Sequence, residues 1–155
     1  MIGIIDYNMG NLASVYNACK LIDADATIVK NPEDLKKFNR VILPGVGAYK
    51  DAMEHLIQTG MNEAVYEFAK TGKPMIGICL GMQLLFESSQ EFGHSDGLGL
   101  IDGHVIKFDK SKMHEDFKIP HMGWNTIKNK ENPLFEGLKD PYLYFVHSYH
   151  VVTSE

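Results

Sequence analysis

A chain of 155 residues, 45% hydrophobic and 23% charged, has the composition of one globular domain with a substantial core. Its net charge of -5, with a single arginine among 15 basic residues, argues against a nucleic-acid partner. The two cysteines lie in different surroundings and indicate a reducing cytoplasm rather than a disulfide framework, and no apolar run is long enough to cross a membrane.

In the first 88 residues, apolar strand patterns alternate with helical patterns. We expect strands at 2–5, 26–29, 40–43 and 75–78, and helices at 11–22, 32–38, 52–69 and 80–88, with a break near Gly60. Such alternation predicts right-handed βαβ units and a parallel sheet.

After Glu91 the pattern changes to strands separated by turns. We expect strands at 101–108, 123–127, 142–146 and 149–153, with turns at Asn132-Pro133 and Asp140-Pro141. The fold class that follows is α/β: an open, mostly parallel sheet flanked by helices, with an antiparallel or mixed extension in the second half.

The most informative stretch is 73–83, which predicts a buried strand that turns sharply into a helix with Cys79 on the turn. Gly77 and Gly81 flank the thiol symmetrically, as in the Gly-x-Ser-x-Gly nucleophile elbow. The N–H groups and dipole of the following helix favour a thiolate. A free cysteine is usually a small buried hydrophobe, and this explains Cys19 but not the two glycines. The pattern therefore predicts acyl transfer through a thioester.

Three turns, at 6–11, 44–47 and 79–81, are expected at the carboxyl ends of parallel strands, where ligands bind in open α/β sheets. Taken alone, 44–47 (Pro-Gly-Val-Gly) is simply a tight turn. Beside a nucleophile, its glycines let backbone N–H groups approach a developing oxyanion. The N–H of Leu80, directly after the nucleophile, is the other natural donor.

Together these motifs resemble the class I, triad-type glutamine amidotransferases, whose fold is flavodoxin-like. More narrowly, the chain is similar to the glutaminase subunits of imidazole glycerol phosphate synthase, from histidine biosynthesis. The narrower resemblance covers essentially all 155 residues and rests on four runs, at 6–11, 44–48, 120–125 and 144–149.

The resemblance implies that Cys79 attacks the side-chain amide of L-glutamine, releases ammonia, and forms a glutamyl thioester that water hydrolyses. It places the oxyanion between the N–H of Leu80 and an N–H of Val46 or Gly47. The resemblance also implies that the positions holding the glutamine are Gln83, Glu91, His147, Ser148 and Tyr149. No Cys/His cluster has metal-ligand spacing, and we expect neither a metal nor a cofactor.

The resemblance also implies a partner, a (β/α)8-barrel cyclase that receives the ammonia and forms a heterodimer with this subunit. The residues that would face the cyclase are Asn11, His121, Met122, Gly123, Trp124, Asn125 and Tyr144. Taken alone, Trp124 would be read as a core aromatic, and the motif favours the interface instead.

The family's catalytic base is a histidine of a His-Pro-Glu run near the C-terminus, and these 155 residues contain no such run. We therefore expect residues 1–155 to be a single glutamine amidotransferase domain truncated at its C-terminus, or else a naturally short, impaired form. Without the triad base, the chain alone should hydrolyse glutamine poorly. Two other functions stay open: a paralogous subunit for surface-sugar biosynthesis, and a non-catalytic binding subunit.

Overall fold

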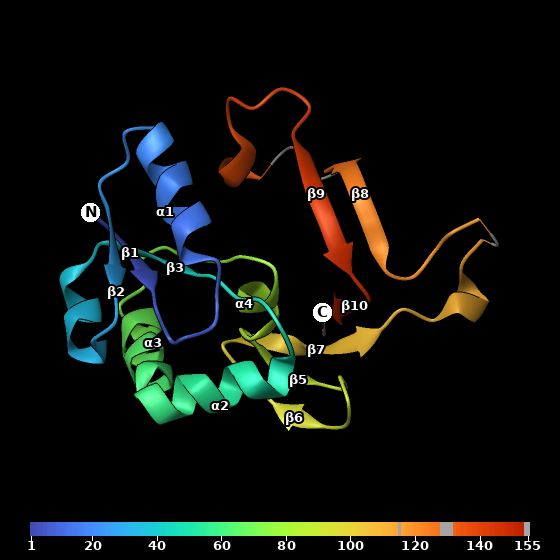
Figure 1. The fold of residues 1–155 in the computed structure, drawn as a ribbon, viewed down its shortest axis with the longest axis horizontal. Coiled ribbons are helices and arrows are strands. Elements are labelled where there is room, and N and C mark those ends of the chain that lie inside the picture. Colours follow the sequence, from blue (N-terminus) through green and yellow to red (C-terminus); the bar gives the residue numbers. More distant parts are fainter. Residues whose placement is uncertain (115, 128–131, 154–155) are drawn as a thin grey trace. The chain divides into compact units, whose positions relative to one another are not determined.

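The structure, a computed structural model, describes residues 1–114, 116–127 and 132–153 (Figure 1). The chain forms two compact units. The first contains residues 1–106 together with the stretch from Val151 onward, and the second contains residues 107–150.

Four parallel strands build the first sheet, in the order β2-β1-β3-β4. They are β1 (Ile2–Ile5), β2 (Ala26–Val29), β3 (Arg40–Leu43) and β4 (Met75–Gly77). Their apolar runs form the core, where Ile4, Ile5 and Leu43 are completely buried. The predicted parallel sheet is therefore confirmed.

The helices of this unit are α1 (Leu12–Leu21), α2 (Tyr49–Thr59) and α3 (Met61–Lys70), and a 3-10 helix η1 (Pro32–Lys37) fills the predicted helix at 32–38. The Asn11 side chain accepts a hydrogen bond from the Ser14 N–H at 3.2 Å and begins α1. Gly60, at φ 71°, separates α2 from α3, which confirms the predicted break.

The chain reverses its direction across the sheet between β1 and β3. From β1 it crosses to β2 on one side, and from β3 it crosses to β4 on the other. Right-handed crossovers in opposite directions place α1 and α3 on opposite faces of the strands, as Figure 1 shows. The carboxyl ends of β1 and β3 thus form a topological switch point, the usual ligand site of such sheets.

Two expectations for residues 75–88 are wrong. The helix α4 (Leu80–Gln83) has only one turn and is followed by strand β5 (Phe86–Ser89). The carbonyls of Leu84 and Leu85 accept hydrogen bonds from the N–H groups of Leu98 and Leu100, at 2.9 and 2.8 Å, so this segment pairs with a later one. In addition, β4 forms one edge of its sheet and Ile76 is 40% exposed, so β4 is not covered on both faces.

A second, mixed sheet has the order β10-β7-β5-β6. Besides β5 it contains β6 (Ser95–Asp96), β7 (Ile101–Lys107) and β10 (Tyr149–Val152). The strand β5 pairs in parallel with β7 and antiparallel with β6, which confirms the predicted mixed character of the second half.

The second unit is built on an antiparallel hairpin of β8 (His121–Thr126) and β9 (Tyr142–His147). It also holds two short 3-10 helices, η2 (Lys110–Lys112) and η3 (Pro133–Phe135). His121 pairs with His147, and Trp124 pairs with Tyr144. Because side chains alternate along a strand, this register puts the two histidines on one face and the two large aromatics on the other.

Candidate active site

Cys79 lies on a strained turn directly after β4. Its φ of 54° and ψ of -119° form a conformation that residues with a Cβ rarely adopt, and its side chain is exposed. The flanking glycines are required by backbone contacts. A Cβ at Gly77 would lie 2.5 Å from the Met82 nitrogen, and one at Gly81 would collide with the Leu43 carbonyl. The predicted elbow is present, and its glycines let β3, β4 and α4 approach closely as well as leaving the thiol uncrowded.

The three turns predicted at the carboxyl ends of the strands do converge. The Tyr7 hydroxyl donates a hydrogen bond to the Pro44 carbonyl at 2.9 Å and joins the loop after β1 to the loop after β3. Gly45 packs so closely on the elbow that a Cβ there would lie 2.5 Å from the Gly81 nitrogen. Cys79 therefore lies against the switch point.

The predicted oxyanion donors border this turn. Leu80 is the first residue of α4, and an N–H in the first turn of a helix has no acceptor within that helix. The next two N–H groups do have acceptors, because Gly81 donates to the Ile78 carbonyl and Met82 donates to the Cys79 carbonyl, both at 3.0 Å. Val46 and Gly47 follow Gly45 in the loop that packs on the elbow, and Gly47 has φ 91°. Their N–H groups remain predicted donors.

Tyr7 is a residue of this site that the sequence reasoning did not single out. Its side chain is completely buried. Burial is the main cause that raises the pKa of the Tyr7 phenol far above its usual value, and the nearby Cys79 raises it further. The hydroxyl therefore keeps its proton and remains a donor to the Pro44 carbonyl. The one signal in the sequence was its position in the run 6–11, one of the runs that carry the resemblance.

Two predicted glutamine-binding residues belong to the first unit. Glu91 accepts a hydrogen bond from the Tyr49 N–H at 2.8 Å, and Tyr49 is the first residue of α2. A carboxylate there satisfies a free N–H and complements the helix dipole, so Glu91 also stabilises the start of α2. Gln83 is the half-buried last residue of α4. Their contact with glutamine remains a prediction.

The other predicted binding residues lie where β9 passes into β10. His147 ends β9, the Ser148 carbonyl accepts the Phe108 N–H at 3.0 Å, and Tyr149 begins β10. The predicted interface residues 121–125 all lie on β8, and Tyr144 lies opposite Trp124 on β9. Asn11 belongs to the first unit, where it caps α1.

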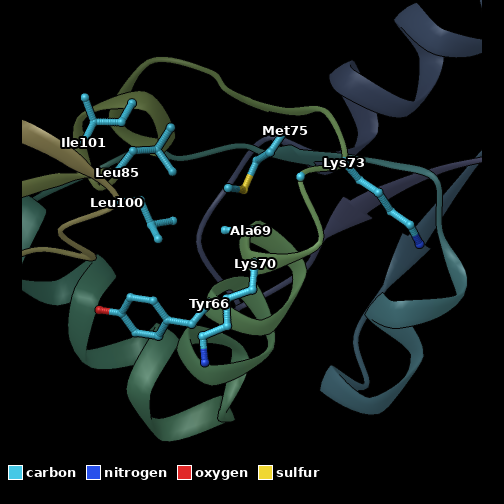
Figure 2. Close-up of a pocket in the computed structure, with 9 residues that line it drawn as sticks. Tyr66, Ala69, Lys70, Lys73, Met75, Leu85, Leu100 and Ile101 are labelled. Atoms are coloured by element: carbon cyan, nitrogen blue, oxygen red, sulfur yellow. The ribbon is translucent and has the colours of Figure 1, made fainter.

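Figure 2 shows a cavity of about 480 Å³ whose lining does not include Cys79. Its wall includes Met75, the first residue of β4, whereas Cys79 follows the end of that strand. Tyr66, Leu85 and Leu100 also line it, and it contains none of the predicted site residues. Among the described residues, no three His, Cys, Asp or Glu side chains are grouped to hold a metal ion. Within those same ranges, no helix has the length and hydropathy of a membrane span.

Comparison with known proteins agrees with this geometry. The family model "Glutamine amidotransferase class-I" matches residues 3–155. "Imidazole glycerol phosphate synthase subunit HisH" of Sulfurimonas denitrificans is 60% identical over all of this chain and 75% of the relative, and that of Wolinella succinogenes is 60% identical over 99% and 76%.

The HisH protein of Bacillus licheniformis is 50% identical over 97% of this chain and 72% of its own length. The solved "Crystal structure of glutamine amidotransferase" aligns with a TM-score of 0.67 and 19% identity, over 94% of this chain and 70% of that chain, and supports the fold. The chain belongs to the class-I glutamine amidotransferase family, and within it to the HisH subunits of imidazole glycerol phosphate synthase.

Proposed function

We propose that this chain hydrolyses L-glutamine to glutamate and ammonia, as the glutaminase subunit of imidazole glycerol phosphate synthase in histidine biosynthesis. The observation that carries the proposal is the exposed Cys79 thiol on its strained elbow at the switch point. The relatives named HisH, up to 60% identical, favour the histidine pathway over a paralogous pathway for surface sugars. We place the reaction in the cytoplasm, where free cysteines such as Cys19 and Cys79 stay reduced.

In the proposed reaction, the Cys79 thiolate attacks the side-chain amide carbon of glutamine. The negative charge that develops on the amide oxygen is stabilised by the N–H of Leu80 and by an N–H of the Val46–Gly47 segment. The carbon–nitrogen bond then breaks and ammonia leaves with one added proton. Water hydrolyses the resulting thioester, which releases glutamate and restores the thiol.

Proton transfer in both steps requires a general base. The 155 residues contain no His-Pro-Glu run, and we assign this role to none of the described histidines. The second candidate function is a subunit that binds the partner without thioester chemistry.

We further propose that ammonia passes to a (β/α)8-barrel cyclase subunit. Support comes from one face of the hairpin, which we call the aromatic face and which alternation assigns to Met122, Trp124, Tyr142, Tyr144 and Val146. All five side chains are exposed, and Trp124, at 68%, is far from a core position in its own unit. Exposed groups of large apolar side chains mark interaction surfaces, and tryptophan and tyrosine often dominate their binding energy.

The two candidate functions are separated by glutamate release and by labelling of the nucleophile. The native protein in complex with its cyclase should release glutamate from L-glutamine, and Cys79→Ala should abolish the release without loss of the fold. The glutamine analogue 6-diazo-5-oxo-L-norleucine should add one covalent label at Cys79, seen by mass spectrometry. A complex that forms but shows neither glutamate release nor labelling would establish the binding subunit instead.

A further inference from the structure

The second unit contains a series of hydrogen bonds that passes through two histidines. The Asn125 amide nitrogen lies 2.6 Å from His121 Nε2, and His121 Nδ1 lies 3.2 Å from His147 Nε2. At the other end, His147 Nδ1 lies 2.7 Å from the Tyr149 carbonyl oxygen. We call these four residues the histidine relay.

The positions of the protons follow from the carbonyl end of the histidine relay. A carbonyl oxygen only accepts, so His147 Nδ1 carries a hydrogen, and in the neutral ring His147 Nε2 is an acceptor. His121 Nδ1 must then donate to it, which leaves His121 Nε2 to accept from the Asn125 amide. With both rings neutral, each of the three hydrogen bonds has one proton and one acceptor.

Aromatic side chains hold both rings in place. Phe145 stacks on His121 with ring centres 5.0 Å apart and an interplanar angle of 23°. Phe108 packs on His147 at 5.1 Å and stacks on His150 at 4.6 Å. Both relay histidines are half-buried, so their hydrogen bonds are partly protected from water.

We propose that His121 and His147 are positioning residues for glutamine binding, which couple Asn125 on β8 to the backbone of Tyr149. This inference rests on the function proposed above and on the sequence prediction that Ser148 and Tyr149 hold the glutamine and that β8 faces the cyclase. The bond from His147 to the Tyr149 carbonyl fixes the start of β10. The bond from Asn125 to His121 fixes the ring that supports His147.

Two substitutions of His147 separate its two bonds. In His147→Asn, the amide nitrogen takes about the place of Nδ1 and keeps the bond to Tyr149. In His147→Gln, the amide reaches the place of Nε2, so the bond to His121 is kept and the bond to Tyr149 is lost. Loss of one such bond should raise the KM for glutamine about tenfold in His147→Gln, and about threefold in His147→Asn, with kcat changed less than twofold in both.

The assay is glutamate release by the native protein at saturating cyclase, and the matched control is His114→Gln. His114 lies in the same unit, with its side chain 72% exposed, and should leave KM unchanged. Asn125→Ala alters an exposed side chain and keeps the test open should His147→Gln not fold. It should raise KM about threefold, and adding it to His147→Gln should raise KM no further, because both break one series.

Equal KM values for His147→Gln and the wild type would overturn the inference, as would equal damage in the two His147 variants or additive effects with Asn125→Ala. These outcomes require an active wild-type complex. A wild-type complex that releases no glutamate would instead refute the proposed function, and the inference with it.

Discussion

Glycine at position 79 should give a more stable protein than alanine at the same position, although both substitutions remove the proposed nucleophile. The φ of 54° at Cys79 costs about 1–3 kcal/mol in any residue with a Cβ. Alanine retains this cost. Glycine removes this strain, but it lowers the free energy of unfolding by about 0.5–1 kcal/mol because the unfolded chain has greater conformational freedom. The free energy of unfolding of Cys79→Gly should therefore exceed that of Cys79→Ala by about 1 kcal/mol, which corresponds to a Tm higher by about 2–4 °C.

Urea unfolding of the two variants measures this difference, provided that the slope of the free energy with urea stays the same. Phe92 supplies a control, because it has φ 55° and a side chain that is 88% exposed in a loop. The free energy of unfolding of Phe92→Gly should likewise exceed that of Phe92→Ala. If the gain appeared at Phe92 but not at Cys79, the elbow would not be strained and our account of its geometry would be wrong.

Three further predictions concern Tyr7, Tyr49 and Trp124. Tyr7→Phe should lower the free energy of unfolding by about 1–2 kcal/mol, because the Pro44 carbonyl loses its buried donor. Tyr49→Phe should leave the free energy of unfolding unchanged or raise it, because the Tyr49 hydroxyl is buried and has no partner in the described part of the chain. Denaturant titration of the two variants compares these effects. Burial, chiefly, raises the pKa of both phenols above the usual 10.0, so only the unfolded state loses these protons just above pH 10. The free energy of unfolding should be independent of pH just below pH 10 as far as these tyrosines contribute, and should fall above pH 10 by up to about 1.4 kcal/mol per pH unit for each tyrosine. If the free energy of unfolding of the double variant Tyr7→Phe, Tyr49→Phe fell as steeply above pH 10, this account would be refuted. Trp124→Ala should weaken cyclase binding at least tenfold in calorimetry and leave Tm unchanged, and a loss of Tm with full affinity would return Trp124 to a core role.

The first sheet and its helices could be predicted because their signals are local. The apolar run 2–5 and the Arg40–Leu43 segment are short, continuous and bounded by turns, and they became β1 and β3 with the predicted limits. Asn11 precedes an apolar helical repeat and accepts the expected capping bond. Each of these features depends on residues within one turn or one strand.

The strand β5 could not be predicted in the same way. Leu84, Leu85 and Phe86 continue the helical pattern of α4 and contain no β-branched residue, so local propensity favours a helix. Their carbonyls instead accept N–H groups of residues 98–101, which lie more than ten positions further along the chain. Tertiary hydrogen bonding overrides the local preference here, and no pattern within 80–88 carries that information.

The same distinction separates the nucleophile from the histidine relay. The elbow was recognisable because Gly77, Cys79 and Gly81 are close in sequence and the turn requires each of them. His121 and His147 are 26 positions apart, and their bond exists only in one register of the hairpin. A slip of one residue would move His147 to the aromatic face and away from His121. The elbow that carries the proposed nucleophile can therefore be identified from sequence, whereas the contacts of the histidine relay depend on strand pairing and are found only in the structure.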